Sequence, residues 1–439
     1  MASVLPSGVE VDTQGDAFVK VSPVRTSDGP VTPGPRTYDV IVVGAGIVGL
    51  AVGLTLSRRH PSLHLAVIDK EPSIGAHQTG HNSGVVHRGV YYAPGSLKAQ
   101  LCVAGASELL AFCDEHGIPY QECGKLIVAT DVQEAGRLEE LERRGRLNGV
   151  PDLELIGPER MAEIEPAIVG VRALYSPRTA VLDFSLVARA YAERFAHSGG
   201  EIHLRAEVRS IRRADGVAIL ETTGGVFRAR HVIACAGLHA DRVAGRSPMS
   251  GARRLRIIPF RGDYYVLRPE TAAMVRGLVY PVPDPRFPFL GVHFTRRIDG
   301  AVWAGPNAVL ALAREGYGRF DVSVRDASGM LGFGGFWRMA ARYWRTGLAE
   351  VWRDYSKGAF LHALRRYMPT LTRADLLPGP SGVRAQAVMA DGLLVDDFAL
   401  DVSDTAVHVL NAPSPAATSA LAIAGLIADR ADDAFDLRR

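Results

Sequence analysis

The chain is poor in cysteine and lysine, and it carries little excess charge of either sign. Its 439 residues include only five lysines among 50 basic residues, against 47 acidic ones, for a formal net charge of +3. The chain as a whole therefore lacks the basic excess of a nucleic-acid-binding protein, and we expect no nucleic-acid partner. The cysteines show neither CxxC pairing nor zinc-ligand spacing, which excludes a disulfide-stapled scaffold, and we expect no bound metal. They are Cys102, Cys113, Cys123 and Cys235.

The start of the chain lacks the charged and apolar segments of a secretory signal, so we expect a reduced, cytoplasmic protein. Residues 1–36 combine proline, glycine, serine and threonine with several acidic residues. That composition argues against an acid-poor transit peptide and predicts a disordered tail. At roughly 150 residues per domain, the length predicts two or three units with large cores.

Long uncharged runs are scarce, and only residues 40–57 and 405–426 raise the question of a membrane span. The first run contains four glycines, and the second is interrupted at Asn411-Ala-Pro-Ser-Pro415. Both are typical of buried strand–turn–helix units, so we expect no transmembrane helix.

Residues 40–69 contain the complete dinucleotide-binding fingerprint. A buried strand, 40–43, leads into Gly44-Ala-Gly-Ile-Val-Gly49 and a helical pattern, and a second strand, 64–68, ends at Asp69, twenty residues beyond Gly49. Gly44 permits the tight turn, Gly46 lets the backbone approach a pyrophosphate, and Gly49 lets helix and strand pack closely. The helix N-terminus favours phosphates, and Asp69 can accept hydrogen bonds from both ribose hydroxyls. FAD and NAD share this fingerprint.

Two further segments favour a flavin over a nicotinamide. Residues 71–92 are small and polar and can lie along an extended dinucleotide, with Asn82 and Ser83 offering donors and Gly84 allowing close approach. A short apolar strand, 229–234, ends in small residues, as a cofactor passing the carboxyl end of a strand requires. These small residues include Ala236 and Gly237.

The C-terminal segment adds a third piece of the expected cofactor site. A strand at 408–410 precedes Ser414, which we expect to cap a helix whose first position is Pro415. The N-terminus of that helix would stabilise the negative charge that develops on a flavin when it is reduced.

With these segments, the chain resembles the FAD-dependent oxidoreductases of the D-amino-acid oxidase and glycerol-3-phosphate dehydrogenase superfamily, and within it the L-2-hydroxyglutarate oxidases and dehydrogenases. The resemblance extends from residue 38 to residue 428, with Asp69 where relatives commonly carry glutamate. The segments that carry it are 77–87 (HQTGHNSGVVH), 91–98 (YYAPGSLK), 259–265 (PFRGDYY), 289–295 (FLGVHFT), 305–307 (GPN), 382–387 (GVRAQA) and 408–418. It implies further cofactor contacts at Ile47, Val48, Lys70, Thr79, Val208 and Ala416.

The resemblance implies an α/β fold, in which a Rossmann-like FAD-binding domain is interleaved with a mixed-sheet substrate domain. Segments 118–129, 171–182 and 256–267 alternate as antiparallel strands do, and the resemblance implies that they roof the flavin. Helical 184–197 and strand-like 201–211 return to the nucleotide-binding domain. We expect the FAD-binding domain to contain residues 37–115, 184–245 and 376–435, and the substrate domain to contain 116–183 and 246–375.

A 2-hydroxy diacid needs fixed cations, a base for its hydroxyl proton and a hydride acceptor. Arg384 is the first candidate for a carboxylate, because Gly382-Val-Arg384 is similar to the carboxylate clamp of amino-acid-oxidising relatives; Arg261 is the second. His87 is the first candidate for the base, because the resemblance places its segment beside the flavin, and His293 competes with it. A covalent link from His87 to the flavin stays open as an alternative.

The resemblance thus implies oxidation of L-2-hydroxyglutarate to 2-oxoglutarate, with hydride transfer to flavin N5 and electrons passed to oxygen or quinone. Oxidation of an amino acid or of glycerol 3-phosphate is the nearest alternative. A flavin-dependent tRNA modifier and a flavin-binding protein without catalysis are the alternatives from other classes, and the near-neutral charge argues against the tRNA modifier.

Residues 333–367 form a basic, tryptophan-rich stretch. Seven basic residues stand against two acidic ones, and Trp337, Trp344 and Trp352 fall near one helical face. We expect these tryptophans to pack on the substrate domain. The alternative is an interfacial helix that brings the protein to the inner face of the cell membrane, where a flavin dehydrogenase would reach quinone.

Overall fold

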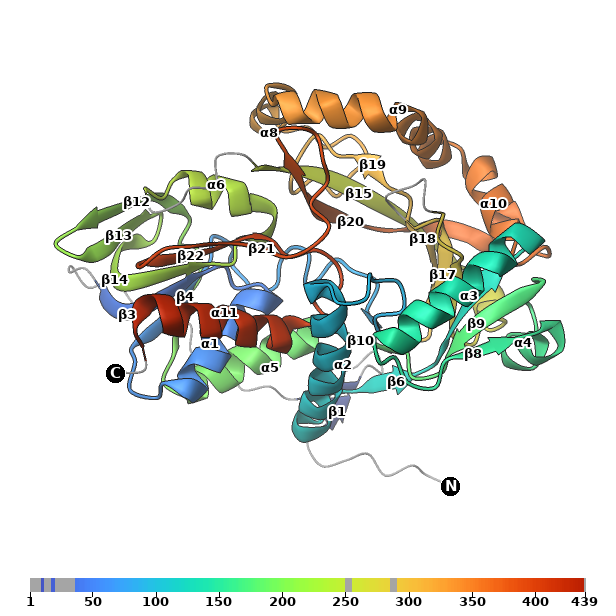
Figure 1. The fold of residues 1–439 in the computed structure, drawn as a ribbon, viewed down its shortest axis with the longest axis horizontal. Helices are drawn as coiled ribbons and strands as arrows, with labels where there is room; N and C mark the ends of the chain where they lie inside the picture. The colour runs from blue at the N-terminus through green and yellow to red at the C-terminus, as the bar shows by residue number, and fades with distance from the viewer. Residues whose placement is uncertain (1–8, 12–16, 20–35, 249–254, 285–289, 438–439) are drawn as a thin grey trace.

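The structure is a computed structural model that describes residues 9–11, 17–19, 36–248, 255–284 and 290–437. Within these residues, two large mixed sheets organise the molecule, and helices cover them (Figure 1). The mixed α/β fold implied by the resemblance is therefore confirmed.

The first large sheet has a parallel part, and its antiparallel strands all lie on the side of β14 away from β3. Three stretches of the chain that are far apart in sequence supply its strands. The parallel strands, in order across the sheet, are β11 (Glu201–His203), β4 (Leu65–Ile68), β3 (Arg36–Val43), β14 (Gly225–Ala234) and β22 (Ala406–Asn411). The antiparallel additions are β13 (Val217–Thr222) and β12 (Val208–Ala214) beside β14, and β21 (Ala399–Val402) beside β22.

Both faces of this sheet are buried, which explains the uninterrupted apolar run of β3. Val40 and Val42 face one layer of helices, whereas Ile41 and Val43 face the β12–β14 meander and α6 (Ala240–Gly245). The helical layer consists of α1 (Ile47–Arg59), α2 (Leu97–His116), α5 (Phe184–His197) and α11 (Ala420–Phe435), with α1 packed against both α5 and α11.

The second large sheet is mixed and contains most of the remaining strands. Its path runs β19 (Val309–Leu310), β15 (Leu255–Leu267), β18 (Val302–Gly305), β17 (His293–Arg296), β16 (Leu278–Pro281), β7 (Lys125–Ala129), β9 (Arg172–Ser176) and β8 (Glu154–Ile156). A three-stranded sheet of β5 (Val85–Val86), β10 (Ala180–Leu182) and β6 (Tyr120–Glu122) is separate from it. The associated helices are α3 (Val132–Leu147), α4 (Pro158–Ile164), α7 (Pro269–Ala272), α8 (Val324–Leu331), α9 (Gly334–Tyr355) and α10 (Lys357–Arg365).

One expected domain boundary is wrong. β20 (Leu376–Met389) pairs antiparallel with β15 from Leu376↔Leu267 to Met389↔Leu255, so it belongs to the second sheet and not to the nucleotide-binding part. The reason is a long-range one: β15 offers a partner along its whole length, and no local signal in 376–389 specifies that pairing.

The helix expected to begin at Pro415 begins later, at Ala420, and its N-cap is Ser419 rather than Ser414. Residues 414–418 form a turn in which the amide of Ala416 donates to the carbonyl of Pro413. Pro413 and Pro415 lack amide donors, and each restricts the residue before it, which delays the helix.

The two uncharged runs form strand–turn–helix units, as predicted: β3 with α1, and β22 with α11. No helix within the described part of the chain is long and apolar enough to cross a membrane. Most of the tail expected at 1–36 lies outside the described residues. Within it, β1 (Val9–Val11) pairs antiparallel with β2 (Ala17–Val19), which differs from the expected disorder at those residues because their strand pairing satisfies backbone groups.

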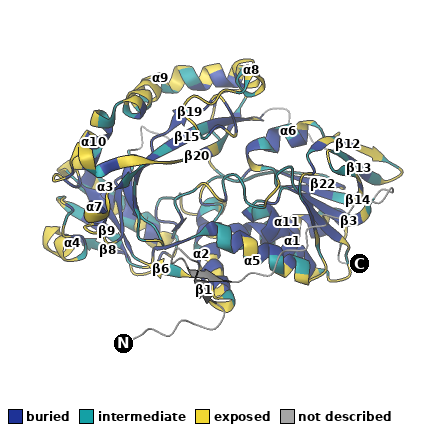
Figure 2. Ribbon diagram, turned by 180° about the vertical axis from the view of Figure 1, so that it is seen from behind, coloured by how far each residue is buried: buried dark blue, intermediate teal, exposed yellow. Residues whose placement is uncertain are grey.

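The tryptophans of the basic stretch do not pack on the substrate domain, so that expectation is wrong. Trp337, Trp344 and Trp352 are 55%, 55% and 67% exposed, and α9 runs along an edge of the molecule with exposed residues on its outer side (Figure 2). The opposite side of α9 buries Phe336, Met339 and Asp354. The spacing correctly predicted one helical face, but that face points to solvent.

Candidate active site

The glycine fingerprint forms the wall of a cavity of about 300 Å³. A Cβ on Gly49 would lie 1.9 Å from the carbonyl oxygen of Gly44, and a Cβ on Gly44 would lie 2.4 Å from that of Cys235. A Cβ on Gly46 would instead approach Thr79 Oγ1 at 3.5 Å and project into the space beside the start of α1. The turn and the helix contact thus exclude side chains, while Gly46 leaves room for a ligand backbone, which fits a pyrophosphate at the helix N-terminus.

Asp69, at the end of β4, lines this cavity as expected. Its Oδ2 accepts from the backbone N–H of Ala45 (2.6 Å), and its Oδ1 accepts from that of Glu71 (2.9 Å). Burial raises the pKa of Asp69, and these backbone donors oppose the rise. Because a carboxylate offers about four lone-pair positions, the two oxygens can still accept from ribose hydroxyls. Val208, Lys70, Ala236 and Gly237 also line the cavity.

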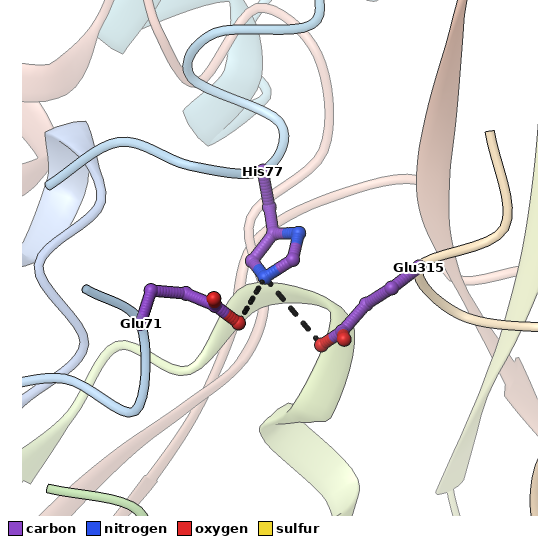
Figure 3. Close-up of side chains that lie close together, drawn as sticks. All are labelled: Glu71, His77 and Glu315. Atoms are coloured by element: carbon purple, nitrogen blue, oxygen red, sulfur yellow. Dashed lines mark hydrogen bonds and ion pairs between the residues drawn. The ribbon is translucent and has the colours of Figure 1, made fainter. Parts of the chain in front are cut away.

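Glu71, His77 and Glu315, which line this cavity, form a cluster of charged and polar side chains (Figure 3). His77 Nε2 lies 2.9 Å from Glu71 Oε1 and 3.4 Å from Glu315 Oε1. Two carboxylates and a histidine are a ligand set that metals use. However, Lys70 Nζ contacts both carboxylates, at 2.5 Å for Glu315, and His239 Nε2 lies 2.7 Å from Glu315. An ammonium group therefore already neutralises these oxygens, and the geometry is that of an ion-pair network.

Two expectations for the loop after β4 need correction. The side-chain amide of Asn82 donates to the carbonyls of Gln78 and Thr79, while its Oδ1 accepts from the Gly84 amide. These bonds use both donors of Asn82, so it shapes the loop rather than donating to a cofactor. Gly84 has φ +74, and a Cβ there would lie 2.6 Å from the Leu182 carbonyl oxygen; the close approach is to β10 and not to a dinucleotide.

Thr79 and Ser83, from the same loop, and Ile47 and Val48, at the start of α1, lie on cavity walls. Thr79 Oγ1 accepts from the Ile47 amide at 3.0 Å, which joins the loop to the start of α1. Ser83, Ile47 and Val48 line a second, larger cavity of about 710 Å³. The two cavities share Gly46, Thr79 and Gly237. An extended dinucleotide that occupied both would have its pyrophosphate at the shared residues, over the N-terminus of α1.

The larger cavity is bounded by all three segments of the cofactor site and by the second sheet. The turn that contains Ser414, Pro415 and Ala416 forms one wall, although the helix behind it starts five residues after Pro415. Residues from β15, β16, β17 and β20 form the opposite wall. Those that carry polar side chains are Tyr264, Tyr280, His293, Arg384 and Gln386.

Arg384 lies on β20 with its side chain on the cavity wall. Its guanidinium interacts with the Tyr264 hydroxyl, and it takes part in none of the ion pairs found among the described residues. A guanidinium on a cavity wall that makes no ion pair within the described structure is suited to a carboxylate ligand, which it can bind with two parallel hydrogen bonds.

Arg261 does not reach the cavity, so its expected role in binding a substrate carboxylate is wrong. Its guanidinium is buried and donates to both carboxylate oxygens of Asp263, to Asp354 Oδ2 at 3.2 Å and to the carbonyl of Gly318. These bonds engage all three guanidinium nitrogens and anchor the C-terminal part of α9 to β15.

The variant Arg261→Met is therefore expected to lower stability and not catalysis. Removal of the Arg261 guanidinium leaves Asp354 buried, although Arg319 Nε, at 3.3 Å, still pairs with that carboxylate. The cost should lie near the lower end of the range for breaking a buried pair, about 3 kcal/mol in the free energy of unfolding. Urea denaturation measures this loss, and kcat/KM of the folded variant should stay within about threefold of the original. A tenfold lower kcat/KM with unchanged unfolding would contradict the structural role.

His87 and His293 both face the larger cavity. Burial, together with nearby positive charges, lowers the pKa of each to about 3, so both are neutral at pH 7. His293 Nδ1 lies 2.8 Å from the Gly291 carbonyl oxygen and donates to it, which leaves Nε2 as the acceptor. His87 Nδ1 is buried without a hydrogen-bond partner among the described residues. Only His293 thus has a tautomer fixed by its neighbours.

Sequence reasoning missed several residues around these histidines. Thr418 Oγ1 accepts from the His87 amide and contacts the Val85 carbonyl, which fixes β5 against the C-terminal turn. Lys125 is fully buried near the rings of Tyr91 and Tyr280. The signal for Lys125 was available, because it is one of five lysines and opens an otherwise apolar strand.

A glycine-rich dinucleotide groove that continues beneath a mixed sheet defines a flavoprotein oxidoreductase. A family model described as FAD dependent oxidoreductase matches residues 39–430, and the chain belongs to that family. The FAD-bound L-alpha-glycerophosphate oxidase of Mycoplasma pneumoniae shares the fold with a TM-score of 0.70 at 23% identity, covering 89% of this chain and 93% of that one. Glycine oxidase of Geobacillus kaustophilus gives 0.67 at 21%, with 91% and 95% covered.

Within the family, the chain groups with L-2-hydroxyglutarate dehydrogenases. The mitochondrial enzyme of Nematostella vectensis is 47% identical over 91% of this chain and 91% of its own length. That of Homo sapiens is 44% identical, with 96% and 94% covered, and that of Escherichia coli is 44% identical, with 90% and 93% covered. The resemblance found from the sequence motifs is confirmed, and so is FAD as the cofactor of the family.

Proposed function

We propose that this protein catalyses the FAD-dependent oxidation of L-2-hydroxyglutarate to 2-oxoglutarate. The observation that carries the proposal is the larger cavity, in which Arg384, with no carboxylate partner among the described residues, faces the same space as two neutral histidines. A 2-hydroxy acid needs this combination of cation and base. The activity named for relatives of 43–47% identity supports the particular substrate.

Arg384 and His293 have different roles in this proposal. Arg384 would hold the carboxylate next to the carbon that is oxidised. Nε2 of His293 would accept the proton of the 2-hydroxyl, because its Nδ1 is engaged with Gly291. Bound FAD would supply the hydride acceptor. The wall formed by residues 409–418 would exclude water from the other side of the cavity.

Anaerobic mixing of the holoenzyme with single substrates tests this proposal. L-2-Hydroxyglutarate should bleach the flavin absorbance, whereas its D enantiomer, L-lactate, glycerol 3-phosphate and an L-amino acid should not. Reduction by one of these other compounds alone would refute the substrate assignment, and reduction by none would favour a flavin-binding protein without this activity. Reoxidation by oxygen and by a soluble quinone, measured after the first reaction, then identifies the electron acceptor.

We further propose that α9 lies on a membrane surface. Its outer face carries Trp337, Trp344, Leu348, Trp352 and Tyr355, all exposed. Arginines flank this face, and the guanidinium of Arg345 lies 5.3 Å from the Trp344 ring centroid. Aromatic and aliphatic residues bordered by arginines are typical of an interfacial helix on an anionic surface, and this position would bring the protein to quinone.

Replacing Trp337, Trp344 and Trp352 with glutamine should lower the fraction that sediments with anionic liposomes. Each indole that leaves the interface costs on the order of 1 kcal/mol or more at about 25 cal/mol per Å² of apolar surface, so we expect at least a tenfold weaker partition for the triple variant. Val132→Ser, which removes an exposed apolar side chain from α3, is the control. An original protein that stays in the supernatant at low salt would refute the membrane contact.

A further inference from the structure

Lys125 is a buried cation that has no carboxylate partner among the described residues. It is the first residue of β7, and its side chain is only 1% exposed. No hydrogen bond or ion pair formed by its ammonium group is found among the described residues. Its Nζ lies 4.8 Å from the ring centroid of Tyr91 and 5.5 Å from that of Tyr280. Both tyrosines line the larger cavity.

An unpaired buried ammonium is costly, and two ring contacts offset only part of that cost. Burial lowers the pKa of Lys125 to about 8, and Cys102 acts in the opposite direction. A carboxylate bound beside Lys125 would offset the cost of burying the ammonium charge and would raise its pKa again.

Two more polar groups beside Lys125 also lack partners. The hydroxyl of Tyr91 and Nδ1 of His87 are buried and make no hydrogen bond within the described structure. Both residues line the larger cavity. Buried polar groups usually have partners, so a cation, a hydroxyl and an imidazole nitrogen left unsatisfied in one corner indicate a place for an anionic ligand group.

Lys125 and Arg384 both lower the pKa of His87 and of His293, but their order of strength differs. Among the charges that lower the pKa of His87, that of Lys125 is the strongest, whereas at His293 the charge of Arg384 outweighs that of Lys125. Lys125 is therefore the cation that acts more strongly on His87, and Arg384 is the one that acts more strongly on His293. A five-carbon diacid has its two carboxylates at opposite ends of the molecule.

We propose that Lys125, with the Tyr91 hydroxyl, binds the distal carboxylate of the substrate and thereby selects diacids over monoacids. This assignment rests on the proposed oxidation of L-2-hydroxyglutarate. The subsite is built from β7 and from the segment after β5, so it is separate from the Arg384 clamp on β20. A monoacid of the same length would leave the ammonium buried without a counter-charge, and this penalty is the source of the selectivity.

The test compares L-2-hydroxyglutarate with L-2-hydroxypentanoate, which has the same chain length without the second carboxylate. In the variant Lys125→Met, kcat/KM for the diacid should fall by about 10- to 100-fold, as expected for one lost hydrogen bond to a charged group. The value for the monoacid should change by less than about threefold or rise. Anaerobic flavin reduction by each acid separates binding from chemistry, because the loss should appear in KM and not in the limiting rate.

Lys98→Met is the matched control. Lys98 lines the larger cavity, and its Nζ donates to the Asp396 carbonyl at 3.0 Å, so its ammonium group has a hydrogen-bond partner. The diacid-to-monoacid ratio should stay within about threefold in this variant. An equal loss in both lysine variants would mean general attraction of anions and would overturn the subsite.

The outcomes also separate this proposal from the proposed function. Failure of the original holoenzyme to be reduced by L-2-hydroxyglutarate refutes the function. Normal reduction combined with an unchanged acid ratio in Lys125→Met refutes only the subsite. Tyr91→Phe, which keeps the ring and removes one hydroxyl, serves as a second variant if Lys125→Met does not retain FAD, and here the diacid preference should fall by about 3- to 10-fold.

Discussion

Replacing Arg384 with methionine is expected to lower kcat/KM for L-2-hydroxyglutarate by about 100- to 10,000-fold. The guanidinium can form two parallel charge-assisted hydrogen bonds with the carboxylate beside the reacting carbon, each worth about 1.5–3 kcal/mol. Removing them also loosens the position of the C–H bond relative to the hydride acceptor, so kcat should fall together with an increase in KM. FAD content and the midpoint of thermal unfolding should stay close to their original values, because Arg384 is not part of the ion pairs among the described residues.

The variant Arg384→Lys separates the effect of the charge from that of the paired donors. Lysine keeps the charge but cannot present the planar pair of donors, so it should recover part of the lost kcat/KM and not all of it. Steady-state kinetics and flavin titration measure both variants. A methionine variant within fivefold of the original would refute the carboxylate clamp.

The two arginine candidates differ for a reason that sequence alone cannot supply. In the register of β15 with β20, Arg384 is opposite Phe260, and Arg261 is opposite Val383. Paired residues share a face of the sheet and successive residues alternate, so Arg384 and Arg261 point to opposite sides. Residues of both alternations line the cavity, Gly382 and Arg384 as well as Val383 and Ala385, so the register alone does not decide between the arginines. Both motifs were recognisable, but only the long-range bonds of Arg261 to Asp354 and Gly318 show that its guanidinium is held elsewhere.

The glycine-rich start of the nucleotide-binding part was predictable because its sequence pattern is local. The glycines at 44, 46 and 49 need their conformation within one turn, and the strands before and after them lie next to each other in the sheet. The substrate half depends on pairings between distant segments, such as Leu278 with Lys125 in β16 and β7. This pairing brings Lys125 beside Tyr280, and no local pattern predicts that neighbour.

The tryptophans of α9 also show that a local sequence pattern does not determine which side of a helix is exposed. Their spacing showed that they share a face, but the direction of that face depends on what holds the other side. Asp354 accepts hydrogen bonds from Arg261 and from Asn307, and Glu350 accepts from the Ala308 amide. These anchors come from β15 and from the segment between β18 and β19, and they turn the acidic side of the helix inward.

Replacing His293 with glutamine is expected to lower the rate of flavin reduction by about 100- to 10,000-fold, the usual contribution of general-base catalysis. KM should change much less, because the side chain keeps its size. The C2–H bond still has to break, so the deuterium isotope effect at C2 should persist or increase. His87→Gln provides the comparison within the same cavity, and its effect on the rate should be at least tenfold smaller. The opposite order of the two variants would transfer the base role to His87.

The pH dependence gives a second, independent test of the histidine. Because burial and the charge of Arg384 lower the pKa of His293 below its ordinary value of 6.5, the imidazole stays neutral at pH values where a free histidine is protonated. A base acts only when it is unprotonated, so kcat/KM should fall as the pH decreases, and the fall should begin below pH 6.5 and not around it. In the glutamine variant this acidic limb should disappear while the residual rate stays flat. A limb that persists with the same midpoint in His293→Gln would show that another group accepts the proton.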